Sequence, residues 1–157
     1  MKIKKVLIAL NYDSSAKKIA KAGCLVANAL HAEIFFLHVL SIPMFYNTMN
    51  YDPTMGFSSF PAFEPELPDV NEKLRVSTQN FLEEIREYFG NLNINILVKE
   101  GDYSETIIET ANLINADLIV LGFHYEQWLE RMVVTSTTEK ILEVSTVPLL
   151  IIPTKEK

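Results

Sequence analysis

Hydrophobic residues fall into five short runs, each nearly continuous in apolar side chains. The runs cover residues 6–10, 34–40, 94–98, 118–121 and 147–152. Runs of this length without polar alternation are typical of strands that are buried on both faces of a sheet. The pattern therefore predicts five buried strands.

Between these runs, apolar residues recur at the three- and four-residue spacing of a helix that buries one side. This spacing covers residues 19–30, 74–89, 107–114 and 141–144. Asp69 paired with Glu72 predicts the start of the second helix and Gly90 its end, and Asp102 or Ser104 precedes the third. Strands and helices are thus expected to alternate along the chain.

This alternation predicts an α/β fold, a single doubly wound five-strand parallel sheet with helices on both faces. In such sheets ligands bind beyond the carboxyl ends of the strands, at the point where the strand order reverses. The first candidates for a site are therefore the residues that follow each predicted strand. They are Asn11, Tyr12, Asp13, Ser41, Gly101 and the residues from Gly122 onward.

Residues 41–70 interrupt the alternation. This segment holds five of the seven prolines and three of the five methionines, and it is longer than most connections. We expect a single domain over residues 1–157 with an insertion at about 41–70. The aromatic residues of the insertion either pack against the sheet edge or a neighbouring subunit, or form a lid over a ligand.

The charge balance argues against a nucleic-acid partner. The 157 residues include 14 Lys and Arg against 20 Asp and Glu, a net charge of −6. A negative field repels polyanions, so any anion site has to be built locally from backbone N–H groups or nearby cations.

The single cysteine, Cys24, excludes an internal disulfide and a multi-cysteine zinc site, which fits a cytoplasmic protein. A buried packing role is favoured for Cys24 over a reactive thiol. His31, His38 and His124 lack metal-ligand spacing, so no metal is expected, and His38 is interpreted as a buried, hydrogen-bonded imidazole. No apolar run approaches the roughly 18 residues of a membrane span, so no membrane association is expected.

The fourth predicted strand and the helix after it have the pattern of an anion cradle. The strand ends at Gly122, and the helix opens at the hydroxyl cluster of residues 135–138. Free N–H groups in the first turn of a helix, together with hydroxyls, favour a negative ligand. Such a cluster is more often an ordinary helix cap, so the signal is weak by itself.

Four segments resemble the universal stress protein family. They are Val6 to Leu10 with Asn11, Tyr12, Asp13 and Ser14 after them; His38 and Val39; Ala116 to Gly122; and Val147 to Pro153. The resemblance covers nearly the whole chain. It implies a sheet of the adenine nucleotide alpha hydrolase-like type and a homodimer that pairs the last strands of two subunits. In one subclass it implies ATP bound between the first and fourth strands.

The resemblance supplies two sets of candidate residues. Those for nucleotide binding are Asn11, Asp13, Val39, Gly122, Tyr125, Thr135, Ser136, Thr137 and Thr138. Those for the dimer interface are Val147, Leu149, Leu150, Ile151 and Ile152.

The phosphate motif of the ATP-binding subclass, G-x2-G-x9-G-[S/T], is only partly present. Gly122 and Ser136 stand at its ends, but Tyr125 and Thr135 replace two glycines, and Asn11 stands at the position of the subclass's aspartate. A Cβ at the glycine positions obstructs a phosphate that lies against the backbone. The sequence therefore disfavours the mode of ATP binding of that subclass. ATP or AMP could still bind through other contacts, made by Gly122 and the hydroxyl residues after it.

The resemblance favours a cytoplasmic, dimeric binding or signalling module of the universal stress type, with an unidentified protein partner, over an enzyme. The alternative is an adenine-nucleotide-binding protein that gates partner binding or hydrolyses ATP slowly. In the loop after the fourth strand, Phe123, Tyr125 and Trp128 either fill the pocket or present an aromatic face to a ligand or partner.

Overall fold

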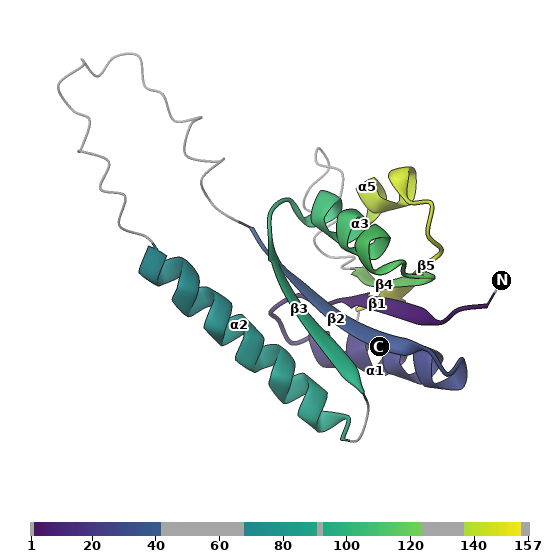
Figure 1. The fold of residues 1–157 in the computed structure, drawn as a ribbon, viewed down its shortest axis with the longest axis horizontal. Coiled ribbons are helices and arrows are strands. Elements are labelled where there is room, and N and C mark those ends of the chain that lie inside the picture. The colour runs from purple at the N-terminus through teal and green to yellow at the C-terminus, as the bar shows by residue number, and fades with distance from the viewer. Residues whose placement is uncertain (1, 42–67, 91–92, 124–136, 155–157) are drawn as a thin grey trace, which may run out of the picture.

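The computed structural model describes residues 2–41, 68–90, 93–123 and 137–154. Strands and helices alternate along them, as the sequence predicts (Figure 1). The strands are β1 (Lys5–Ala9), β2 (Glu33–Leu40), β3 (Ile94–Glu100), β4 (Leu118–Phe123) and β5 (Leu149–Pro153). The helices are α1 (Ala16–Ala29), α2 (Pro68–Tyr88), α3 (Tyr103–Ile114) and α5 (Thr137–Val144).

The five strands form one parallel sheet in the order β3-β2-β1-β4-β5. β1 lies at its centre, where Val6 pairs with Ile34 of β2 on one side and with Leu118 of β4 on the other. The chain moves outward from β1 to β3 and then returns to β4 on the other side of β1. The strand order therefore reverses between β1 and β4, and the predicted doubly wound α/β sheet is confirmed.

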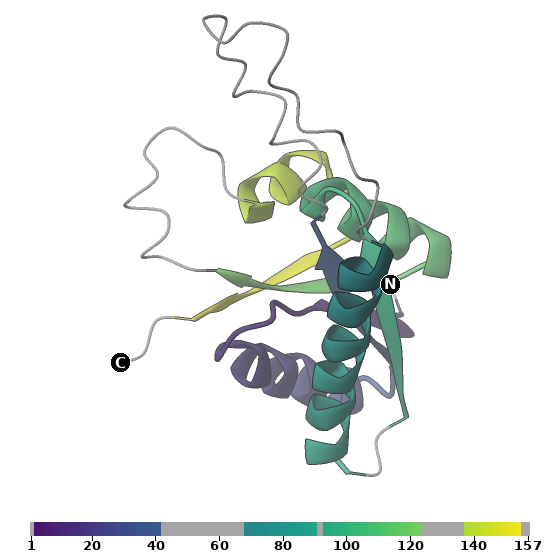
Figure 2. The same cartoon turned by 90° about the vertical axis from the view of Figure 1, so that its left-hand side faces the viewer.

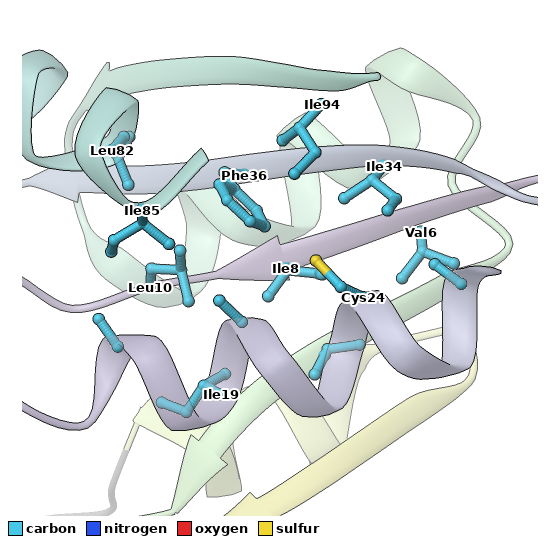
Figure 3. Packing of buried hydrophobic residues seen from close by; sticks show 14 of the residues in the cluster. Val6, Ile8, Leu10, Ile19, Cys24, Ile34, Phe36, Leu82, Ile85 and Ile94 are labelled. Carbon is cyan, nitrogen blue, oxygen red and sulfur yellow. The ribbon is translucent and has the colours of Figure 1, made fainter. Parts of the chain in front are cut away.

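Helices cover both faces of the sheet, α1 and α2 on one and α3 and α5 on the other (Figures 1 and 2). Val6, Leu7 and Ile8 in β1 are completely buried, because successive side chains enter opposite layers. Figure 3 shows the layer under α1 and α2, where Ile8 and Phe36 meet the helical residues. Burial of a side chain such as Phe36 stabilises the fold by about 1.5–3 kcal/mol.

α1 lies close to the sheet because Gly23 has no side chain. A Cβ at this position would lie 2.5 Å from Cδ1 of Ile8. The next residue, Cys24, is only 2% exposed, and burial raises the pKa of its thiol to about 11. Cys24 is therefore a packing residue with little thiolate at neutral pH, as the sequence suggested.

Two of the expected helix signals are confirmed. Asp102 caps α3, its Oδ1 accepting hydrogen bonds from the backbone N–H groups of Ser104 at 2.9 Å and Glu105 at 3.2 Å. Gly90 follows the end of α2 in the left-handed region, at φ 69°.

Two predicted boundaries are wrong. α2 begins at Pro68, so Asp69 lies inside the first turn instead of capping it, and the last residues assigned to the insertion are helical. Proline suits the first helical position because its missing N–H has no partner there in any case. β5 begins at Leu149, so Val147 precedes the strand.

Residues 42–67, the rest of the insertion, lie outside the described residues. Among the helices that the structure describes, none is long and apolar enough to cross a membrane.

The carboxylate of Asp117 binds the backbone at the start of β1. Oδ2 of Asp117 accepts hydrogen bonds from the backbone N–H groups of Lys4 at 2.8 Å and Lys5 at 3.0 Å. The ammonium group of Lys5 donates to the carbonyl of Ile114 at 3.0 Å. The two backbone hydrogen bonds lower the pKa of Asp117 because they favour its ionised form.

This arrangement predicts a specific acid sensitivity. Because the pKa of Asp117 is lower in the folded than in the unfolded chain, its stabilising effect is present above the unfolded value and is lost as the pH falls through the folded value. Asp117→Asn should therefore flatten the decline of unfolding free energy below about pH 5, measured by urea denaturation across pH. The exposed Glu84→Gln is the control and should leave the wild-type profile unchanged.

Candidate functional site

The carboxyl ends of β1 and β4 lie side by side where the strand order reverses. Ile8 in β1 pairs with Val120 in β4, so the segment after β1 emerges next to Gly122. α1 follows β1 at this edge, and Thr138 in the first turn of α5 donates a hydrogen bond from Oγ1 to the carbonyl of Gly122 at 3.3 Å. Two helix N-termini therefore open toward the point at which ligands bind in such sheets.

The turn from β1 into α1 is fixed by hydrogen bonds at both of its ends. The N–H of Leu10 donates to the carbonyl of Leu37 at 2.8 Å, and Nδ1 of His38 donates to the carbonyl of Leu10 at 2.7 Å. Further on, Oδ1 of Asp13 accepts from the N–H of Ser15 at 2.7 Å and from its hydroxyl at 2.5 Å. The expected buried imidazole of His38 is confirmed, and Asp13 stabilises the start of α1.

The remaining predicted residues near β1 differ in accessibility. Asn11 and Asp13 are exposed at the edge, whereas Val39 is only 3% exposed and packs in the core layer under α3 and α5. The described part of the chain contains no group of three or more His, Cys, Asp or Glu residues that could hold a metal ion.

Gly122 has a packing role that the sequence did not suggest. A Cβ there would overlap Cδ1 of Ile19 in α1 and would lie 3.4 Å from Cγ2 of Thr154. Its φ lies outside the left-handed region, which among the described glycines only Gly90 and Gly101 occupy. Gly122 thus brings α1 against β4, and its missing side chain is not by itself a sign of a phosphate site.

The start of α5 is the described part of the predicted anion cradle. Thr137 is exposed, and Thr138 is buried and joined to Gly122. Tyr125, Thr135 and Ser136 lie outside the described residues, as do His124 and Trp128. The contribution of these residues to nucleotide binding stays a prediction.

Sequence reasoning missed two features beside the site. The ring of Tyr12 contacts the ring of Phe81 in α2, with centroids 4.4 Å apart and planes at 51°. The first turn of α1 carries Lys17 and Lys18 and no acidic residue. The two lysines are a readable signal of local positive charge. In the structure, however, Nζ of Lys17 lies over the ring of Tyr88 at the end of α2, 5.7 Å from its centroid.

β5 forms one edge of the sheet, as expected for the last strand, and among the described residues it pairs with β4 alone. The carbonyl of Pro148 accepts from the N–H of Ile119, and the N–H of Thr154 donates to the carbonyl of Phe123. Backbone groups alternate in direction along a strand, so those of Leu149 and Ile151 point to the open edge. The side chains of Leu149, Leu150, Ile151 and Ile152 are half-buried.

Comparison with known proteins agrees with this architecture. The sequence profile of the Universal stress protein family matches residues 2–153. The chain belongs to this family.

Similarity to individual proteins extends over nearly the whole chain. The stress response protein NhaX of Bacillus subtilis is 28% identical, with 94% of this chain and 96% of NhaX covered. A universal stress protein solved in complex with cAMP superposes with a TM-score of 0.65 at 15% identity, over 99% of this chain and 100% of that one. One from Archaeoglobus fulgidus in complex with dAMP gives 0.58 at 14% identity, over 96% and 98%. At these identities the structural likeness shows the fold alone.

The packing role of Gly122 in this universal stress protein is testable by substitution. Gly122→Ala should lower the free energy of unfolding by about 1–3 kcal/mol, measured by urea denaturation, because Ile19 is fully packed and has to move. Ile19→Val removes Cδ1 and should relieve much of this loss in the double variant. Equal losses from Gly122→Ala in the presence and absence of Ile19→Val would contradict the packing role.

Proposed function

We propose that this universal stress protein is a cytoplasmic, non-catalytic binding protein that takes an adenine nucleotide with a short phosphate chain. The carrying observation is the strand order, which brings the segment after β1 beside Gly122 at the edge where α1 and α5 begin. Anionic ligands are favoured at such helix N-termini because the backbone N–H groups have no partner within the helix.

The short phosphate chain is inferred from the residues that surround this edge. Thr137 and the first N–H groups of α5 suit a single phosphate group. Tyr125 and Thr135 replace the glycines along which a longer chain would lie. The universal stress proteins in complex with cAMP and dAMP support the same ligand class, because each of those nucleotides carries one phosphate group.

The bound nucleotide is proposed to act as a signal that alters the affinity for a protein partner. A ligand shifts the equilibrium between two conformations of a protein only through contacts that differ between them. The segment proposed to differ in conformation is Thr137 at the start of α5 with the loop before it. Slow ATP hydrolysis, the alternative function, has no described residue in its favour, and a nucleic-acid partner is not proposed because the chain is acidic.

The ligand is tested by isothermal titration of the purified full-length protein with AMP, cAMP and ATP. AMP or cAMP should bind more tightly than ATP, and Thr137→Ala should weaken AMP binding about tenfold through loss of a hydrogen bond to an anion. Thr146→Ala is the matched control, because Thr146 is an exposed threonine beyond the end of α5. Tighter binding of ATP, with phosphate release above a Thr137→Ala control, would instead support a hydrolase.

We further propose that two copies associate through β5. This strand leaves the backbone groups of Leu149 and Ile151 unpaired within the described sheet. An uncovered edge of this kind favours pairing with the same edge of a second copy. Val147 packs against the core layer before the strand and is proposed to contact the partner only at the margin.

Sedimentation velocity at micromolar concentration tests this interface. The wild type should sediment as a dimer, and Ile151→Pro should give monomers because proline removes an N–H from the open edge. Ile151→Ala is the matched control, because it also shortens the side chain but keeps the N–H and should stay dimeric. Circular dichroism checks that both variants are folded. A monomeric wild type would refute the interface.

A further inference from the structure

Tyr12 is an exposed aromatic residue at the edge of the sheet where the candidate site lies. It follows β1 directly between Asn11 and Asp13, and 56% of its surface is exposed to solvent. Phe81, which is half-buried in α2, supports its ring with centroids 4.4 Å apart. Since the contact with Phe81 covers only part of Tyr12, much of the ring remains available to a ligand.

The backbone on both sides of Tyr12 is held in place. On the preceding side, Leu10 is bonded through its N–H to Leu37 and through its carbonyl to His38, at 2.8 and 2.7 Å. On the following side, the carbonyl of Asp13 accepts from the N–H of Ala16 at 3.2 Å. Binding to such a residue orders little that is not already ordered, so the entropic cost is small.

We propose that Tyr12 is the stacking platform for the base of the nucleotide, an inference that rests on the proposed function. Every base has a flat π-face, and an aromatic side chain that is fixed and exposed on one side binds this face by stacking. The location agrees with this role, because Tyr12 lies at the same edge as Gly122 and the first turn of α5. Tyr12 would thus select a planar base, while the helix starts receive the phosphate.

A purely structural role for Tyr12 makes a different prediction. If Tyr12 serves only to anchor α2 through Phe81, its replacement should lower stability and leave affinity for the base unchanged. Leucine preserves an apolar contact with Phe81 but offers no aromatic face, and phenylalanine preserves both. Comparison of Tyr12→Leu with Tyr12→Phe therefore separates stacking from anchoring.

The experiment is isothermal titration of AMP and of ribose 5-phosphate into the full-length wild type and variants. Tyr12→Leu should weaken AMP binding about tenfold, whereas Tyr12→Phe should stay within about twofold of the wild type. Binding of ribose 5-phosphate should not change, because it lacks a base. Tyr88→Leu is the matched control, since Tyr88 is 65% exposed and packs edge-on against Phe89. Unfolding midpoints identify any variant that is not folded.

A second measurement is independent of variant folding. In the wild-type complex, NMR should show nuclear Overhauser effects between the Tyr12 ring protons and H2 or H8 of adenine. If AMP binds the wild type and Tyr12→Leu equally, or these effects are absent, stacking on Tyr12 is refuted while the proposed function stands. If the wild type binds no adenine nucleotide at all, both the proposed function and this inference are refuted.

Discussion

The close approach of α1 to the centre of the sheet is the packing constraint on which the candidate site depends. Two glycines permit it, because a Cβ at Gly23 would meet Ile8 and a Cβ at Gly122 would meet Ile19. The turn between β1 and α1 is short, so the depth of the helix fixes the position of that turn. Asp13 and His38 then hold the turn by hydrogen bonds to its backbone and to Ser15. Core packing thereby positions the residues that would meet a ligand.

The three inner strands could be predicted from the sequence because helices bury β1, β2 and β4 on both faces. The edge strands β3 and β5 are mostly half-buried, but they keep the same apolar runs. The start of β5 was predicted wrongly because an apolar residue can pack on the core from inside a strand or from the turn before it. Val147 is apolar because it packs on the core layer, but it belongs to a turn in which the Ser145 hydroxyl donates to its carbonyl at 2.8 Å. The start of α2 failed for a different reason, since Asp69 and Glu72 have the spacing of a capping pair although Pro68 already begins the helix.

The position of the candidate site also followed from the sequence, because alternating strands and helices require a reversal of strand order somewhere and ligands bind there. Its details did not follow. The contact of Tyr12 with Phe81 joins β1 to a helix that lies beyond β2 and the insertion, and no local pattern indicates such a partner. Asp13 follows β1, as the sequence indicates, but its hydrogen bonds to Ser15 depend on the conformation of the turn.

Gly122 shows why a partial motif is difficult to interpret from sequence. The sequence shows a glycine in both cases, whether the space beside it is filled by a phosphate or by Ile19. The structure gives this glycine a packing reason that is independent of any ligand, so it would be required even in a protein that binds no extended phosphate chain. Its presence therefore adds little support for ATP. Support for a nucleotide comes instead from the open start of α5 and the exposed ring of Tyr12.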